Sequence, residues 1–301
     1  MILVAGSANL DFVVRAPHIP APGETVLGRD VATYAGGKGA NQAVACARAG
    51  GAPTHLLLAL GDDAFAAPVE ASLRDAGVTM TLVRVAGEST GTAFICLADD
   101  AENAITVAPG ANARLRPEHL PPLDGVTHLL LQLETPIGSV TVWAQRARAA
   151  GVTVVLNAAP AQPLPAALLA AVDVLIVNEG ELAAITGVSG DVDLDVEAAL
   201  ARVEVPCVIV TLGVAGCLAR CADGVSIRQP AFAVEAIDTT AAGDTFCGVL
   251  VAALSRGASL AAALREASAA AAIACTRVGA QASIPTRGEV VASLNRQGAE
   301  N

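Results

Sequence analysis

The stretch "IDTTAAGDTFCG", at Ile237–Gly248, is the most specific part of this sequence, because small residues lead directly into a carboxylate and an apolar helical pattern follows. The side chains of Ala241, Ala242 and Gly243 are too small to cover the N–H groups at the helix start. The helix dipole adds about half a positive charge at that end, so these residues predict an anion hole for a phosphate. Asp244 would lie beside it and accept a proton, although a plain helix cap is an equally good interpretation of this stretch alone.

A second glycine-rich segment, "GGKGANQAVACARAG" at Gly36–Gly50, also precedes a helical pattern. Glycines let backbone N–H groups approach a ligand closely. The segment is not a Walker A loop, since Ala32 stands at the first glycine position and Gly39 follows the lysine, and it lacks the third glycine of a dinucleotide fingerprint. A structural turn is the alternative, but Lys38 and Asn41 favour ligand binding because a packing turn needs neither.

Short apolar runs alternate with helical patterns along most of the chain, as in "THLLLQLE" before "IGSVTVWAQRARAAG". Continuous apolar strands are buried on both faces, and this alternation predicts an α/β fold with a parallel sheet and right-handed crossovers. Ligands of such sheets bind beyond the carboxyl ends of the strands. Polar or small residues follow the strands in "GSANLD", "LGDD", "QLE", "LNAAP", "VNEGE" and "TLGVAG", and this row predicts the rim of an active site.

One of these strand ends, "NEGE" at Asn178–Glu181, carries an amide and a carboxylate three residues apart. On a helix they share one face and are suited to hold water or Mg²⁺ near phosphate oxygens. A capped helix start explains the pattern equally well. The glycine turn in "TLGVAG" is a weak signal when taken alone.

Two segments interrupt the alternation, at about 12–35 and 90–107. Both are typical of exposed strands joined by Pro/Gly or Asp/Asn turns, and neither has a helical pattern. They are suited to pair as a small sheet over the strand ends and act as a lid. Periodicity alone does not distinguish a lid from two surface hairpins without a role.

The composition of the 301 residues indicates a large globular domain, with 53% hydrophobic and only 2% aromatic residues. The net charge of -11 disfavours a broad surface for nucleic acid or an anionic membrane. The seven cysteines are scattered without a Cys-x-x-Cys pair, which favours small core residues in a reducing compartment. The chain starts with a strand-like "MILVAGSANLDF" and no basic flank, so we expect no signal peptide and a cytoplasmic protein.

These motifs, in this order and spacing, resemble the ribokinase-like family of carbohydrate kinases, the phosphofructokinase B type. The resemblance covers almost the entire chain and includes "GSANLD", "PGET", "GGKGANQAVA", "GESTGTA", "PGANA", "NEGE", "TLGVAG", "DTTAAGDTF" and "TRVGAQASIP". It implies a single domain over 1–301, built as a three-layer α/β sandwich with a mainly parallel sheet and a small β lid. It also implies ATP-dependent phosphorylation of the 5-hydroxyl of D-ribose.

The resemblance also assigns roles to residues. It makes Asp244 the base that faces the primary hydroxyl, with the anion hole formed by backbone N–H groups of Ala241, Ala242 and Gly243. The implied sugar contacts are Asn9, Asp11, Gly37, Lys38, Asn41 and Glu134. The implied ATP contacts are Asn178, Thr211, Gly213, Gly216, Gly243 and Ser268, with Glu181 near Mg²⁺ through water. The implied ligands of a K⁺ ion behind the anion hole are Asp238, Thr240, Ala274, Arg277, Gly279 and Ser283.

Some positions depart from the common pattern of the family. Val214 and Ala215 place no basic residue in "TLGVAG", Ser268 stands where a larger polar residue is usual, and Cys247 replaces a frequent Asn. The family often pairs its lids, which implies a homodimer. Rival interpretations are a kinase for 2-deoxyribose, a nucleoside or another small sugar, and a non-catalytic sugar-binding regulatory protein. A nicotinamide dehydrogenase is a poor third, because the dinucleotide fingerprint is missing.

Overall fold

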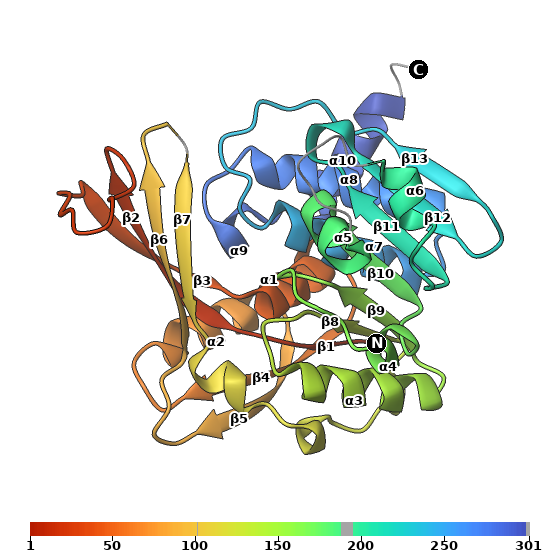
Figure 1. The fold of residues 1–301 in the computed structure, drawn as a ribbon, viewed down its shortest axis with the longest axis horizontal. Coiled ribbons are helices and arrows are strands. Elements are labelled where there is room, and N and C mark those ends of the chain that lie inside the picture. Colours follow the sequence, from red (N-terminus) through yellow and green to blue (C-terminus); the bar gives the residue numbers. More distant parts are fainter. Residues whose placement is uncertain (101, 188–194, 299–301) are drawn as a thin grey trace.

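A central sheet of nine strands dominates the computed structural model, which describes residues 1–100, 102–187 and 195–298 (Figure 1). Its strands are β1 (Ile2–Ala5), β4 (Thr54–Gly61), β5 (Thr79–Val85), β8 (His128–Leu131), β9 (Thr153–Asn157), β10 (Val174–Asn178), β11 (Cys207–Thr211), β12 (Cys217–Cys221) and β13 (Ser226–Gln229). Their order is β13-β12-β11-β10-β9-β8-β1-β4-β5. Neighbours from β5 to β11 are parallel, and β12 and β13 are antiparallel to the strand before each.

Helices cover both faces of this sheet. One face packs against α1 (Lys38–Val44), α2 (Ala66–Asp75), α7 (Ala242–Ser255), α8 (Leu260–Cys275) and α10 (Arg287–Gly298). The other face packs against α3 (Ile137–Ala149), α4 (Ala166–Leu169), α5 (Glu179–Thr186) and α6 (Val196–Leu200). The apolar run of β4 divides between the two cores, with Leu56 and Leu58 on one side and Leu57 on the other. Burial on both faces is why these strands read as continuous apolar runs.

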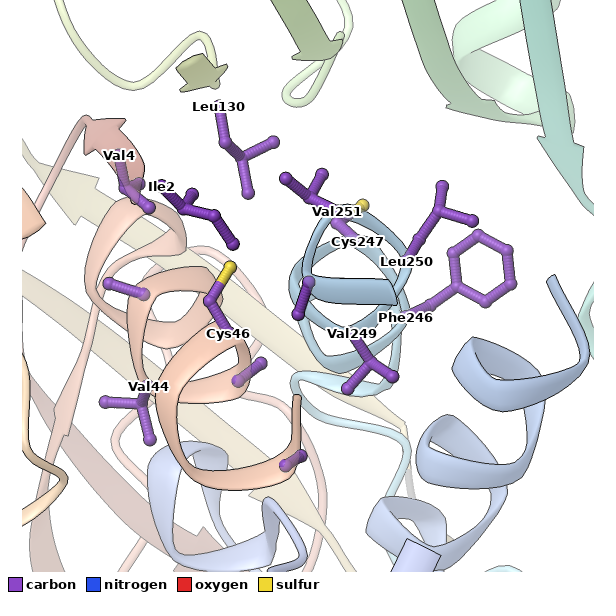
Figure 2. Close-up of a cluster of buried hydrophobic side chains, with 14 of the residues drawn as sticks. Ile2, Val4, Val44, Cys46, Leu130, Phe246, Cys247, Val249, Leu250 and Val251 are labelled. Carbon is purple, nitrogen blue, oxygen red and sulfur yellow. The ribbon is translucent and has the colours of Figure 1, made fainter. Parts of the chain in front are cut away.

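One of the two hydrophobic cores joins α7 to α1 and the central strands. Figure 2 shows Val251 of α7 pointing toward Leu130 and Ile2 of the sheet, while Val249 points to the opposite side, toward the neighbouring helices. Gly248 makes the close packing of the helices possible, because a Cβ there would lie only 2.5 Å from the backbone oxygen of Gln42. This contact fixes the start of α7 beside α1.

A second, four-stranded sheet projects from one edge of the sandwich (Figure 1). It runs in the order β3 (Asp30–Gly36), β2 (Asn9–Ala16), β6 (Gly91–Ala98) and β7 (Asn103–Ala108). Strand β2 pairs antiparallel with β3 and parallel with β6, so the segments at about 12–35 and 90–107 meet in one sheet. The α/β sandwich with a mainly parallel sheet and a small extra β sheet confirms the predicted fold class.

The antiparallel hairpin of β11 and β12 was not anticipated. Only Leu212–Gly216 separate the two strands, whereas a parallel crossover needs a dozen or more residues. Gly216 permits the reversal with a φ of 92°. In the ranges 1–100, 102–187 and 195–298, no helix is both long and apolar enough to cross a bilayer.

Candidate active site

Asp244 lies in the first turn of α7 and is only 7% exposed. Its Oδ2 accepts a hydrogen bond from Nδ2 of Asn41, and its Oδ1 accepts one from Nε2 of Gln42, each at 2.9 Å. The N-cap of the helix, Ala241, provides no side-chain hydrogen bond. The carboxylate is thus held by amides of α1, which favours a functional role for Asp244 over the helix cap that the sequence left open.

A chain of buried amides lies behind this carboxylate. Nε2 of Gln42 also donates to Oδ1 of Asn157 at 2.9 Å, and Oε1 of Gln42 accepts from Nε2 of Gln132 at 2.6 Å. Asn157 in turn donates to the backbone oxygen of Ile176 at 3.2 Å. None of these three amides was assigned a role from the sequence, although Gln132 and Asn157 lie in the predicted rim motifs "QLE" and "LNAAP". Each is a polar residue in or directly after an apolar run, and a buried amide requires partners, which is the signal that was available.

The glycine loop lies directly against the turn that follows β1. A Cβ on Gly39 would lie 2.6 Å from the carbonyl carbon of Gly6, so only glycine allows this approach. Oε2 of Glu134 accepts from the backbone N–H of Lys38 at 3.0 Å and from the hydroxyl of Ser7 at 2.5 Å. Gly37 precedes the helix with a φ of 87°, a conformation that favours glycine.

Lys38 is surrounded by carboxylates. Asp244 raises the pKa of the Lys38 ammonium most strongly, and Glu134 and Glu181 add to the rise, against the opposing effect of burial. The ammonium therefore remains charged although it is half-buried. It places one cation where the glycine loop and the start of α7 meet.

Asn9 and Asp11 lie two residues apart on β2, so their side chains share one face of the strand. Oδ1 of Asn9 accepts from Nδ2 of Asn112 at 2.8 Å, and Oδ1 of Asn112 accepts from the N–H of Ala8 at 3.0 Å. A Cβ on Gly36 of the neighbouring strand would lie 2.0 Å from Oδ2 of Asp11. Glycine at this position makes room for the carboxylate.

Two buried acceptors of this region, Oδ1 of Asp11 and Oδ1 of Asn41, have no hydrogen-bond partner. Burial, and then the charges of Glu134 and Asp244, raise the pKa of Asp11 to about 7. Unpartnered buried acceptors are costly. These two oxygens therefore suit a polar ligand that donates hydrogen bonds from hydroxyl groups.

The start of α7 has an unusual backbone. Ala241 has a φ of 59° and is the one non-glycine residue with positive φ in the described parts of the chain. The N–H of Ala242 donates to the carbonyl of Thr239 at 3.2 Å. The N–H groups of Gly243 and Asp244 belong to the first helical turn, where no intrahelical acceptor exists. The left-handed residue is the kind of local strain that functional loops retain.

Asn178 and Glu181 form a reciprocal capping box at the start of α5. Oδ1 of Asn178 accepts from the N–H of Glu181 at 2.7 Å, and Oε2 of Glu181 accepts from the N–H of Asn178 at 2.8 Å. The capped helix start is therefore present. Burial raises the pKa of Glu181, and nearby Asp244 contributes in the same direction while Lys38 opposes it. Glu181 thus faces the same charged cluster as Lys38.

The other predicted nucleotide contacts lie in the β11–β12 hairpin or, in the case of Ser268, beside it on α8. Thr211 is the register partner of Asn178 across β10 and β11. Gly213 and Gly216 lie in the turn with φ values of 53° and 92°. A Cβ on Gly216 would lie 2.0 Å from a backbone oxygen of β13. Ser268 of α8 is buried, with its Oγ 4.0 Å from the thiol at the start of β12.

Asp238 joins two loops near the start of α7. Its Oδ1 accepts from the N–H of Thr240 at 2.8 Å, and its Oδ2 accepts from the N–H of Gly279 at 2.9 Å. Burial acts against ionisation, but the hydrogen bonds from Gly279 and Thr240 lower the pKa of Asp238 overall. The carbonyl of Ala274, at the end of α8, accepts from the N–H of Arg277 at 3.1 Å.

Two other predicted K⁺ ligands, Arg277 and Ser283, direct their side chains to different partners. The guanidinium of Arg277 pairs with Glu289 at 2.5 Å, and the hydroxyl of Ser283 donates to the carbonyl of Ala280 at 2.8 Å. Arg277 thus has only its backbone oxygen to offer a cation. The hydroxyl of Ser283 retains its oxygen lone pairs for such a contact.

A cavity of about 510 Å³ lies between the four-stranded sheet and these loops. Asp11 and Tyr34 line it from the sheet, and Asp238, Thr240 and Gly279 line it from the sandwich. Residues from distant parts of the sequence thus line one cavity, which Asp11 borders on the sheet side and Asp238 on the loop side.

The chain and its fold are similar to known carbohydrate kinases. Residues 1–287 match the pfkB family of carbohydrate kinases. A ribokinase of Haemophilus influenzae is 41% identical, with 97% of this chain and 98% of that protein covered. A deoxyribokinase of Salmonella typhi is 33% identical over 95% of both. The structure of an Arabidopsis thaliana ribokinase complexed with ribose and ATP is 35% identical, covers 97% of this chain and 98% of that one, and has a TM-score of 0.89.

Proposed function

The chain belongs to the pfkB family of carbohydrate kinases, and from this premise we propose that it transfers the γ-phosphoryl group of ATP to the 5-hydroxyl of D-ribose. The observation that carries the proposal is the position of Asp244. It is a buried carboxylate, fixed by Asn41 and Gln42, in the first turn of a helix whose leading N–H groups have no helical acceptor. Family relatives named as ribokinases support ribose as the acceptor.

In the proposed reaction, Asp244 accepts the proton of the 5-hydroxyl as that oxygen attacks the γ-phosphorus. Phosphoryl transfer requires mainly positioning and charge stabilisation. The N–H groups from Ala241 to Asp244 form the anion hole for the transferred group, and the Lys38 ammonium adds positive charge. Gln42 keeps the carboxylate oriented through its hydrogen bond at 2.9 Å.

We assign the sugar to the place where the start of β2 meets the glycine loop. Its proposed contacts are Asn9, Asp11, Gly37, Lys38, Asn41 and Glu134. A pentose has several hydroxyl groups and little apolar surface, so hydrogen bonds must recognise it. The unpartnered oxygens of Asp11 and Asn41 support this assignment, because they need donors that only a ligand or water would supply.

We place ATP along the carboxyl ends of β10 and β11. Its proposed contacts are Asn178, Thr211, Gly213, Gly216, Gly243 and Ser268. Val214 and Ala215 carry no charge, so the backbone of this turn would contribute most of the phosphate contacts. Mg²⁺ would supply charge stabilisation for the phosphates when bound. Glu181 suits a contact to Mg²⁺ through water, because the capping box engages only its Oε2.

We also propose a K⁺ site behind the anion hole, formed by oxygens of Asp238, Thr240, Ala274, Arg277, Gly279 and Ser283. The fit rests on Asp238, whose lowered pKa keeps it ionised where the two loops meet. Carbonyl and carboxylate oxygens suit a weakly hydrated monovalent cation. An ion there would fix the loop that leads into α7.

We propose that residues 1–301 form one kinase domain whose segments at about 12–35 and 90–107 act as a lid, and that the protein is a cytoplasmic homodimer joined through these lids. Apolar side chains on the face of the small sheet that turns away from the cavity support the proposal of a dimer. Phe12 and Phe94 stack there with centroids 5.4 Å apart, and Phe94 and Val31 are 54% and 66% exposed. Exposed apolar residues gathered on one face are typical of protein interfaces.

The test is kcat/KM for D-ribose and 2-deoxyribose, measured by ADP release. If Asp11 bonds the 2-hydroxyl, losing that hydroxyl leaves a buried carboxylate under-bonded, which costs about 1–3 kcal/mol. Ribose should therefore be preferred by about one to two orders of magnitude, and Asp11→Ala should narrow the gap. A preference for 2-deoxyribose would instead favour a 2-deoxyribose kinase. Absence of ADP release with every sugar or nucleoside would favour a non-catalytic sugar-binding protein.

A further inference from the structure

Cys207 and Cys221 face each other across the β11–β12 hairpin. They are register partners on these antiparallel strands, and their Sγ atoms lie 3.8 Å apart. All seven cysteines of the chain are free thiols in the structure, and both members of this pair are half-buried. A small thiol or disulfide in solution therefore has a route to at least part of each side chain.

The backbone around the pair has the geometry that a disulfide needs. The N–H of Cys207 points away from β12 and donates to the carbonyl of Asp173, just before β10, at 3.1 Å. The N–H of Cys221 points away from β11 and donates to the carbonyl of Val225 at 2.9 Å. The flanking N–H of Ala222 donates to the carbonyl of Pro206 at 2.7 Å. Cys207 and Cys221 are thus a non-hydrogen-bonded pair, for which the Cα atoms are about 4.5 Å apart and the side chains are closest. Disulfides accept Cα separations from about 4.4 Å, so only side-chain rotation is required.

We propose that Cys207 and Cys221 are a redox modification site, which forms a reversible disulfide by exchange with a small disulfide such as glutathione disulfide. The thiolate of one cysteine attacks a sulfur of the reagent, the reagent's S–S bond breaks, and one glutathione leaves and takes up a proton. The thiolate of the second cysteine then attacks the mixed disulfide and releases the second glutathione. The two protein thiols are oxidised and one glutathione disulfide is reduced to two thiols.

The environment of Cys207 affects its reactivity. Burial, and then the neighbouring Cys221, raise the pKa of the Cys207 thiol to about 12. Cys207 is therefore mostly protonated at neutral pH, which disfavours it as the first sulfur to react with the reagent. The second step is intramolecular between sulfurs that already lie within 4 Å, which compensates for the low thiolate fraction of Cys207.

The disulfide would close a short ring around the turn Leu212–Gly216, which the proposed function assigns to ATP. The two cysteines are 14 positions apart in the sequence, and for a ring of this size loop-closure entropy predicts a rise in Tm of about 4 °C. The pair lies at the open end of the hairpin, five positions from the turn on either strand, a distance of about 16 Å. The bond should therefore stabilise the hairpin without changing catalysis.

The experiment treats the full-length protein with glutathione disulfide, blocks remaining thiols with an alkylating reagent, and maps peptides by mass spectrometry without reduction. The expected product is a peptide pair that links Cys207 to Cys221, with two hydrogen atoms lost from the protein mass and complete reversal by dithiothreitol. Cys221→Ser should abolish the link and the rise in Tm. Cys275→Ser, which removes another half-buried thiol, should leave both unchanged.

Three results would overturn the proposal. The first is a stable mixed disulfide with glutathione at Cys221 and no internal link. The second is a link that uses any cysteine other than this pair. The third is no loss of thiols in the wild-type protein at a reagent excess that oxidises a free dithiol control. These readouts do not depend on kinase activity, so the proposed function can fail without affecting them.

Discussion

Replacing Asp11 by Asn should stabilise the free protein while impairing its use of ribose. Asp11 is 8% exposed, its Oδ1 has no hydrogen-bond partner, and its pKa is raised from 3.8 to about 7. The folded protein therefore binds this proton more tightly than the unfolded chain does. Stability is lost as the pH rises from about 4 through 7, because the buried carboxyl must then ionise.

The size of the effect follows from the shift. A rise of about three pKa units corresponds to about 4 kcal/mol, which is the upper limit of the penalty above pH 7. Asn has nearly the same shape and cannot ionise. Asp11→Asn should therefore exceed the wild type in unfolding free energy by up to about 4 kcal/mol at pH 8, and by less than about 2 kcal/mol at pH 5.

Urea unfolding followed by circular dichroism at both pH values measures these differences. Asp124→Asn makes the same chemical change at an exposed position and should alter stability by less than about 0.5 kcal/mol. A loss of stability in Asp11→Asn at pH 8, or a gain that is equal at pH 5 and pH 8, would refute the electrostatic reasoning. Ribose kcat/KM should fall by about tenfold to a hundredfold in the same variant. Unchanged kinetics beside the expected gain in stability would separate Asp11 from the sugar site.

Three further outcomes are expected. Asp244→Asn should lower kcat by at least about a hundredfold while calorimetry still detects ribose binding, and near-normal turnover in a folded variant would remove its role as the base. Gln42→Leu should lower kcat by about tenfold or more, with a smaller change in the KM for ribose, because Asp244 loses one of its two donors. Gln132→Met, which removes only the outer amide, should have the weaker effect, and equal losses in both variants would indicate general destabilisation. K⁺ should raise activity well above Na⁺ or a bulky organic cation, and equal rates in the three salts would contradict the ion site at Asp238.

The motifs that carry the chemistry are local, and this is why the sequence was informative. A helix start with uncovered N–H groups needs only the few residues of Ile237–Gly248, and the glycine loop only those of Gly36–Gly50. Alternating apolar runs predicted the α/β sandwich, because burial on both faces of a parallel sheet leaves a continuous apolar pattern. Strand direction leaves no such pattern, so the antiparallel hairpin at β12 was missed.

The tertiary structure decided what depends on distance in space. Gln42 and Asp244 are 202 positions apart in the sequence, and only the packing of α1 on α7 shows that they share a hydrogen bond. The raised pKa of Asp11 depends on burial and on two carboxylates from distant segments. The scattered cysteines indicated no pair, whereas the register of β11 and β12 places Cys207 opposite Cys221. Residue types and spacing determine which local structures can form, but hydrogen bonds, charge interactions and thiol contacts act over a few ångströms, so they depend on which segments the fold brings together.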